Sequence, residues 1–305
     1  MKSWNAQRAI FGLAFALAFA SSSAWPEESA SYNAYFQGKY ITALKLAEQE
    51  AQAGSKEAYT LMGEIYAEGL GVAQDFSKAA EAYNKAAELG DANAQFSLGT
   101  FAAEGRGVPK DLSKAADLFE QAAKNGNPAA QYNLALVYLH GKGRAPDEAK
   151  AVEWMQKAAA QDNPAAEYDL GAFYQFGRGV TVDKAKAAEW TAKAAEAGLP
   201  EAEVEYGVML FKGEGTAVDE QRAAKFFRLA AEAGNPVAQN RLARLYANGV
   251  VVTTDPVQAA KWHLLARQAG VSDFNLDLLL AKLSKQERAA AEKAAEQWRD
   301  EIRNQ

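Results

Sequence analysis

The sequence predicts an all-α fold, a right-handed solenoid of about six helix-turn-helix repeats with atypical capping helices at both ends. Alanine recurs at a constant spacing along most of the chain, and glycine and aspartate recur in phase with it. The spacing is 36 residues at every step through Ala58, Ala94, Ala130, Ala166, Ala202 and Ala238, and we number the repeats one to six by these alanines. Six copies in phase are not a chance pattern. They predict helix pairs that bury their apolar faces against neighbouring pairs.

Each repeat has the pattern of two helices joined by a short turn. Small and apolar residues follow a helical period from Ala58, which predicts a first helix over about residues 57–68. A Gly-x-Gly turn that begins at Gly69 ends this helix, because glycine tolerates a positive φ. Asp75 then stands where an N-cap belongs, with its carboxylate facing the unpaired amides of a second helix over residues 76–89. The whole chain is expected to contain about fourteen helices.

The pattern A-x-x-x-L-G-x-x-Y-x-x-G-x-G-V-x-x-D-x-x-K-A-x-x-x-x-x-K-A-A-x-x-G resembles the Sel1-like repeat, a relative of the tetratricopeptide repeat, over residues 58–270. The departures are mild: Ala135 and Ala243 replace the first glycine, and Val251 replaces a turn glycine. The resemblance implies a concave groove lined by the first helices. It also implies an adaptor role, which in bacterial members concerns envelope signalling, exopolysaccharide regulation, flagellar or polar organisation, or host contact.

The two ends of the chain differ from the repeat, as the caps of a solenoid do. Lys2 and Arg8 precede an apolar run of 12 residues, and small residues follow it, which is the pattern of a signal peptide cleaved after Ala24. The run is too short to span a bilayer. The predicted divisions are a signal peptide (1–24), an N-terminal capping half-repeat (25–54), six repeats (55–270) and C-terminal capping helices (271–305). We therefore expect a periplasmic or secreted protein with no membrane segment after cleavage.

The composition argues against several classes of function. The chain has 33 basic and 39 acidic residues, so it lacks the positive surface that nucleic acid requires. It has no cysteine, and its two histidines, His140 and His263, lie more than three repeats apart, too far to share a metal ion or a catalytic triad. No serine begins a Ser-x-x-Lys motif, which the β-lactamase chemistry described for cysteine-rich relatives would need. We predict no enzymatic activity, no cofactor and no metal site.

One face of the first helices is the candidate binding surface. Four columns of equivalent residues form a stripe about 160° around the helix from the buried column of Met62. These columns are headed by Thr60, Glu64, Ala67 and Glu68. We call these four columns the binding stripe. It is polar in repeats one and six, where it includes Asn240, Arg244 and Asn248 at the far end, and it is apolar between them.

An apolar centre between polar ends is typical of a peptide-binding groove. The predicted partner-binding residues are Phe96, Tyr132, Leu136, Leu139, His140, Tyr168, Phe176 and Phe211. We expect about half of them to pack against the adjacent repeat, and Tyr132, Leu136 and Tyr168 to stay partly exposed.

The sequence thus predicts an exported scaffold, a monomer, that binds a partner protein or an extended peptide in its concave groove. An accessory factor that binds envelope glycan is the alternative, and a β-lactamase-type hydrolase is a third hypothesis with no motif behind it. Glycan binding would favour exposed aromatic side chains beside carboxylates, whereas peptide binding favours a continuous apolar groove.

Overall fold

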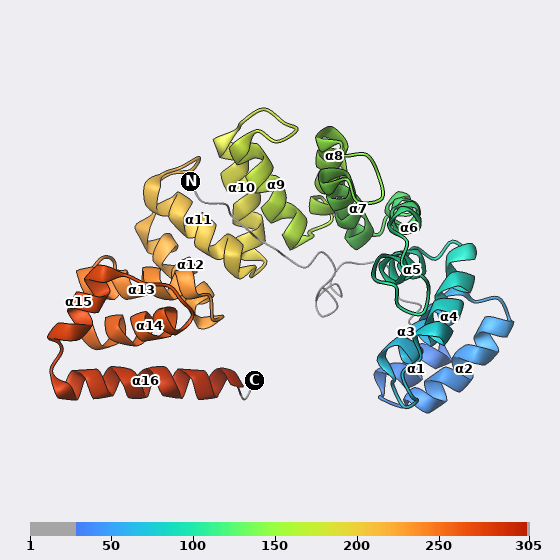
Figure 1. The fold of residues 1–305 in the computed structure, drawn as a ribbon, viewed down its shortest axis with the longest axis horizontal. Coiled ribbons are helices and arrows are strands. Elements are labelled where there is room, and N and C mark those ends of the chain that lie inside the picture. Colours follow the sequence, from blue (N-terminus) through green and yellow to red (C-terminus); the bar gives the residue numbers. More distant parts are fainter. Residues whose placement is uncertain (1–28, 304–305) are drawn as a thin grey trace. The chain divides into compact units, whose positions relative to one another are not determined.

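The computed structural model describes residues 29–303, and over this range the chain forms sixteen helices and no strand (Figure 1). The helices are α1 (Ala30–Phe36), α2 (Tyr40–Gln52), α3 (Lys56–Glu68), α4 (Phe76–Glu88), α5 (Ala92–Glu104), α6 (Leu112–Lys124), α7 (Pro128–His140), α8 (Glu148–Ala159), α9 (Pro164–Phe176), α10 (Lys184–Glu196), α11 (Pro200–Lys212), α12 (Glu220–Glu232), α13 (Pro236–Asn248), α14 (Pro256–Gln268), α15 (Phe274–Lys282) and α16 (Lys285–Arg303). The predicted all-α repeat solenoid is confirmed, with two helices more than the fourteen expected. The predicted signal peptide and its cleavage site lie outside the described residues.

The helices form two compact units, which divide between residues 163 and 164. In the first unit, α1 packs on α2, α2 packs on α3, and each later helix up to α8 packs on the one before it. The second unit repeats this order from α9 to α14, and α16 then packs along α14. Each helix pair therefore contacts mainly its neighbours in the sequence, as expected for a repeat architecture.

The predicted N-caps of the second helices are confirmed. The Oδ1 atom of Asp75 accepts hydrogen bonds from the backbone amides of Ser77 and Lys78 at 3.1 and 3.0 Å. The equivalent aspartates cap their helices in the same way, at Asp111, Asp147, Asp183, Asp219 and Asp255. These carboxylates satisfy amides that the helix leaves unpaired, so the aspartate column has a structural cause.

The second glycine of each turn allows a close approach between successive repeats. Gly107 has a φ of +61°, and a Cβ atom there would lie 2.1 Å from the carbonyl oxygen of Phe76 in the preceding repeat. Gly143 approaches Leu112 in the same way, with a φ of +82°. Val251 occupies the equivalent position in repeat six with a φ of 65°, a conformation that a β-branched side chain adopts only with strain.

The core depends on columns of small residues. The alanines at the position of Ala86 are fully buried in all six repeats (Ala86, Ala122, Ala158, Ala194, Ala230 and Ala266). Gly63 lies against the ring of Tyr83, because a Cβ atom there would fall 2.5 Å from that ring. Where Ala135 replaces this glycine in repeat three, the position of Tyr83 is taken by Met155, whose flexible side chain leaves more room.

The C-terminal helices close the second unit. Ser284 and Glu287 form a capping box at the start of α16, with each side chain bonded to the other residue's backbone amide. The indole of Trp298 meets that of Trp262 edge-on, with 5.9 Å between ring centroids, so Trp298 of α16 packs against α14. Among the described helices, none combines the length and the apolar character that crossing a bilayer requires.

Candidate functional site

In the first unit the binding stripe runs along α5 and α7. The side chains of Phe96, Tyr132, Leu136 and Leu139 are half-buried, and His140 is exposed at the end of α7. Phe96 packs on Phe119 of α6, with 5.8 Å between ring centroids, so part of this residue belongs to the core. The expectation that Tyr132 and Leu136 stay partly exposed is met.

In the second unit the apolar part of the stripe is more open to solvent. Tyr168 on α9 is half-buried, whereas Phe176 and Phe211, at the ends of α9 and α11, are 61% and 38% exposed. Exposed phenylalanines lose contact with water only when another molecule covers them. Because the predicted site residues are divided between the two units, each set is described by itself.

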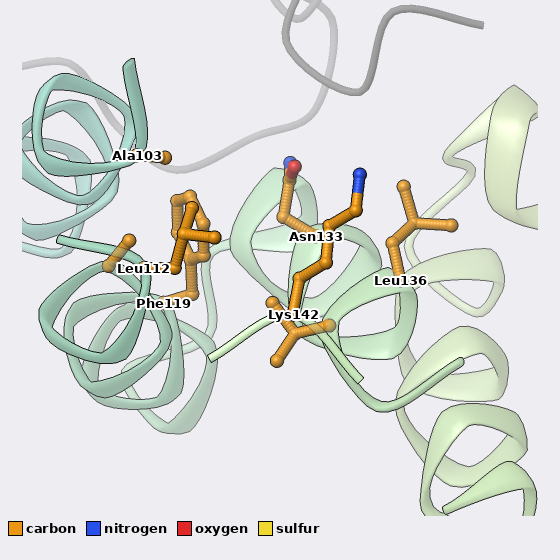
Figure 2. Close-up of a pocket in the computed structure, with 8 residues that line it drawn as sticks. Ala103, Leu112, Phe119, Asn133, Leu136 and Lys142 are labelled. Carbon is orange, nitrogen blue, oxygen red and sulfur yellow. The ribbon is translucent and has the colours of Figure 1, made fainter. Parts of the chain in front are cut away.

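A small pocket opens between α6 and α7 within the first unit (Figure 2). The enclosed space is only about 10 Å³, and its lining consists of Ala103, Leu112, Ala115, Phe119, Asn133, Leu136, Val137 and Lys142. The side chains of Asn133 and Lys142 point in the same direction and supply its polar atoms (Figure 2). The Nδ2 atom of Asn133 donates to the carbonyl of Ala129 at 2.9 Å, whereas the exposed Lys142 has no ion pair within residues 29–303.

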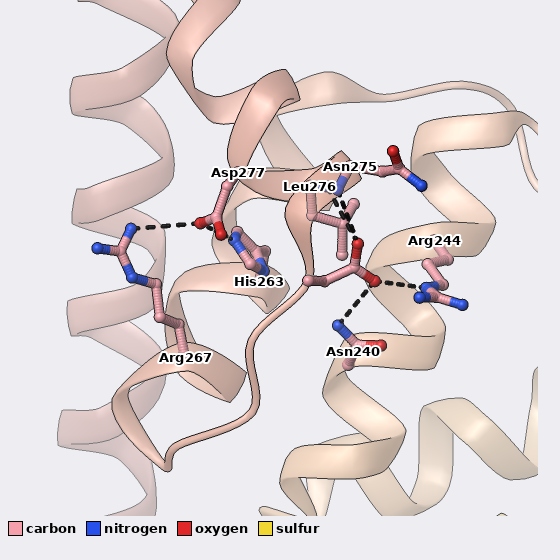
Figure 3. Close-up of polar contacts among 8 residues, drawn as sticks. Asn240, Arg244, His263, Arg267, Asn275, Leu276 and Asp277 are labelled. Carbon is pink, nitrogen blue, oxygen red and sulfur yellow. Dashed lines mark hydrogen bonds and ion pairs between the residues drawn. The ribbon is translucent and has the colours of Figure 1, made fainter.

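The polar ends of the stripe are only partly open to solvent: Glu68, Arg244 and Asn248 are exposed, whereas Thr60 and Asn240 are buried. Thr60 is only 3% exposed, and its hydroxyl donates to the carbonyl of Lys56 at 3.2 Å. Asn240 is contacted by Asp273 at the start of α15 (Figure 3). The repeat pattern could not reveal that α15 lies against Asn240.

One carboxylate at the start of α15 forms hydrogen bonds with two stripe residues of repeat six. Asp273 accepts hydrogen bonds from Nε of Arg244 at 2.5 Å and from Nδ2 of Asn240 at 3.3 Å, and it also caps α15 through the amides of Asn275 and Leu276 (Figure 3). Burial acts to raise the pKa of Asp273, but the hydrogen bonds from Arg244, the Leu276 amide and Asn240 hold it below its ordinary value.

A second perturbed carboxyl lies at the other end of the stripe. Burial raises the pKa of Glu64 from 4.5 to about 7, and the nearby charges of Asp91 and Glu68 act in the same direction. No basic group contributes to this shift. The ionised form of Glu64 therefore destabilises the fold around α3 above neutral pH.

Comparison with known proteins decides the family. Six consecutive segments match the Sel1 repeat: residues 56–91, 92–127, 128–163, 164–199, 200–235 and 236–271. The chain belongs to the Sel1 repeat family. These segments include every residue of the predicted binding stripe.

Solved structures agree with this assignment. A Sel1 repeat protein from Oxalobacter formigenes is 31% identical, with a TM-score of 0.71, and the match covers 78% of this chain and 98% of that one. A protective antigen of uropathogenic Escherichia coli with the same type of repeat is 29% identical, with a TM-score of 0.56, over 88% of this chain and 67% of that one. A search of curated proteins found no significant match.

Sel1 repeat proteins typically mediate protein–protein interactions, and their scaffold is generally non-enzymatic. In this member, residues 29–303 contain no group of three or more His, Asp or Glu side chains placed to hold a metal ion. The buried His263 pairs through Nε2 with Oδ1 of Asp277 at 2.9 Å, a contact that joins α14 to α15 (Figure 3). His263 thus has a structural role.

Proposed function

We propose that this Sel1 repeat protein is an exported scaffold whose binding stripe holds a partner protein or an extended peptide. The observation that carries the proposal is that apolar side chains on α7 of the first unit, and on α9 and α11 of the second unit, are left half-buried or exposed by the protein's own packing. Solvated columns of a repeat are polar by default, so apolar residues there need another cause. Contact with a partner supplies that cause.

The last repeat offers an intramolecular precedent for such binding. The segment that begins α15 lies on the stripe residues Asn240 and Arg244, and its Leu276 is 2% exposed. The start of α15 therefore contacts this face of repeat six through the carboxylate of Asp273. In repeats three to five the corresponding columns hold uncharged and mostly apolar residues, which favours a partner that contributes apolar contacts.

Export rests on the N-terminal pattern alone. A basic start, an apolar run of 12 residues and small residues up to Ala24 favour cleavage before Trp25. The intact mass of protein recovered from the periplasm tests this directly. A mass that begins at Trp25 supports export, whereas a full-length protein held at the inner membrane contradicts it.

The binding proposal is tested by a triple variant of the mature protein, Tyr132→Ser, Leu136→Ala and Tyr168→Ser. In-cell crosslinking first identifies the partner of the wild-type protein, and the recovery of that partner is then compared between variants. A matched control, Leu89→Ser with Leu229→Ser, changes the leucine that follows α4 and a leucine of α12, which are 50% and 40% exposed. Both variants should keep the wild-type circular dichroism, and only the triple variant should lose the partner.

Unchanged capture by a folded triple variant would show that the stripe is not the binding surface. Co-sedimentation with purified peptidoglycan tests the glycan alternative on the same proteins. Retention by the glycan, together with no crosslinked protein partner, would favour that alternative.

A further inference from the structure

We propose that a groove between α10 and the turn that follows α11 is a binding site for one arginine side chain of a basic partner. The groove lies within the second unit, and no residue that lines it belongs to the binding stripe, so this inference goes beyond the proposed function. Its volume is about 210 Å³, many times the about 10–15 Å³ that one water molecule needs, so it can admit a long side chain. The lining includes Ala185, Ala188, Glu189, Ala192, Tyr206 and Thr216.

In the first unit, an arginine of the chain itself fills the equivalent place. The guanidinium of Arg144, in the turn that follows α7, pairs with Asp117 of α6 and lies 3.4 Å from Oε2 of Glu120. Two repeats later, the positions of Asp117, Glu120 and Arg144 hold Glu189, Ala192 and Thr216, and all three line the groove. The groove therefore keeps one of the two carboxylates that bind Arg144, but a short threonine replaces the arginine.

The backbone has the same geometry around both places. A Cβ atom on Gly143 would lie 2.1 Å from the carbonyl oxygen of Leu112 in the preceding repeat. At the equivalent position, a Cβ atom on Gly215 would lie 2.0 Å from the carbonyl oxygen of Lys184. The turn thus approaches the second helix equally closely in both units. The groove results from shorter side chains and not from a wider separation of backbone segments.

The carboxylate of Glu189 can accept a further cation. Its Oε1 atom lies 3.9 Å from Nζ of Lys193, and its side chain is 61% exposed. In the first unit, Glu120 pairs with Lys124 of the same helix at 2.7 Å and still lies 3.4 Å from the guanidinium of Arg144. A neighbouring lysine therefore does not exclude an arginine from this kind of site.

The chemistry of the groove favours an arginine from a basic protein. A guanidinium can form two parallel hydrogen bonds with one carboxylate, and it is weakly hydrated, so it also packs well on apolar groups. The aliphatic part of its side chain would cover the methyl groups of Ala188 and Ala192. The net charge of this chain is −6, which disfavours a second copy as the occupant and attracts a basic partner.

Nuclear magnetic resonance of the mature protein with isotope-labelled alanine methyl groups tests this site. The probe is the capped tripeptide acetyl-Gly-Arg-Gly-amide, and its control carries citrulline, which has a similar shape without the charge. We expect the arginine peptide to shift the methyl signals of Ala185, Ala188 and Ala192, and the citrulline peptide to leave them in place. Glu189→Gln should weaken binding about threefold, as for an exposed ion pair. Glu220→Gln, the same change at an exposed residue of α12, should have no effect.

Two further variants change the groove itself. Ala192→Glu restores the second carboxylate found in the first unit and should tighten binding of the arginine peptide about threefold. Ala192→Glu combined with Thr216→Arg recreates the internal arrangement of Arg144, so this double variant should lose the binding. Circular dichroism like that of the wild type would show that both variants keep the fold.

Three results would overturn the proposal. Equal shifts with the arginine and citrulline peptides would show that charge is not recognised. Binding that persists in the double variant would place the peptide outside the groove. A wild-type protein that sediments as a dimer, together with a double variant that sediments as a monomer, would identify a second copy as the occupant. None of these results bears on the binding stripe, because the stripe is tested by recovery of the crosslinked partner.

Discussion

Replacing Glu203 by glutamine should stabilise the protein, because three of the six repeats place a hydrogen-bond donor at this position of the first helix, whereas repeats four and five place Glu167 and Glu203 there. In three repeats this column holds a glutamine whose Nε2 atom donates to the carbonyl eight residues earlier. The pairs are Gln95 with Ala87 at 3.2 Å, Gln131 with Ala123 at 3.2 Å, and Gln239 with Ala231 at 3.3 Å. Glu203 occupies the same column with 5% exposure, and an ionised carboxylate cannot donate to the equivalent carbonyl of Ala195.

The expected gain in the free energy of unfolding has two contributions. A net intramolecular hydrogen bond contributes about 0.5–1.5 kcal/mol, and removing the partly desolvated charge of Glu203 adds to it. We therefore expect the free energy of unfolding of Glu203→Gln to exceed that of the wild type by about 1–2 kcal/mol at pH 8. The reverse change, Gln131→Glu, should cost about 1–3 kcal/mol at the same pH.

The gain should depend on pH in a defined direction. Burial raises the pKa of Glu203 in the folded state, so the wild-type protein loses stability as the pH rises through that folded value. Below the ordinary value of 4.5 the carboxyl is protonated in both folded and unfolded chains, and it can donate as glutamine does. The advantage of Glu203→Gln should therefore be largest at pH 8 and small near pH 4.

Urea unfolding followed by far-ultraviolet circular dichroism, carried out at both pH values, measures this difference. The reasoning is refuted if Glu203→Gln gains nothing at pH 8, or if its gain is the same at both pH values. An unchanged stability of Gln131→Glu would show that the column does not depend on the donated hydrogen bond.

Three further predictions concern other sites. Val251→Gly should raise the free energy of unfolding by about 0.5–1 kcal/mol in urea titrations, since it removes strain at a φ of 65°; a loss of stability would contradict this. Glu64→Gln should stabilise the protein by about 1–2 kcal/mol at pH 8 and by little at pH 4, because the folded pKa of Glu64 is about 7; equal gains at both pH values would argue against a raised pKa. Arg244→Ala should speed hydrogen exchange of the α15 amides about tenfold, since it leaves the Asp273 carboxylate with weaker partners; exchange at the wild-type rate would show that Arg244 does not hold α15 in place.

The repeat architecture could be predicted because its causes are local and periodic. An aspartate that caps the helix beginning one residue later, or a glycine that takes a positive φ, acts within a few residues of itself. The period of 36 residues then places each of these devices in every repeat. For the same reason the strain at Val251 could be located from the one turn that lacks its glycine.

The candidate site could be predicted only in outline, because exposure depends on contacts between helices. Phe96 and Tyr168, in the column of Thr60, are both half-buried, whereas Phe176, in the column of Glu68, is 61% exposed. Nothing in the repeat pattern separates these three aromatic residues. The neighbouring helix decides which of them is core and which is surface.

The sequence by itself determined the helix boundaries, the caps, the small-residue columns and the family, since these depend on backbone chemistry repeated at a fixed period. Only the tertiary structure decided that Asn240 is buried under α15 and that Glu203 is only 5% exposed. Each of these depends on which side chain arrives from another helix or turn. Burial and pairing depend on contacts between side chains of different helices. A periodic sequence pattern does not predict these contacts where one repeat differs from the others.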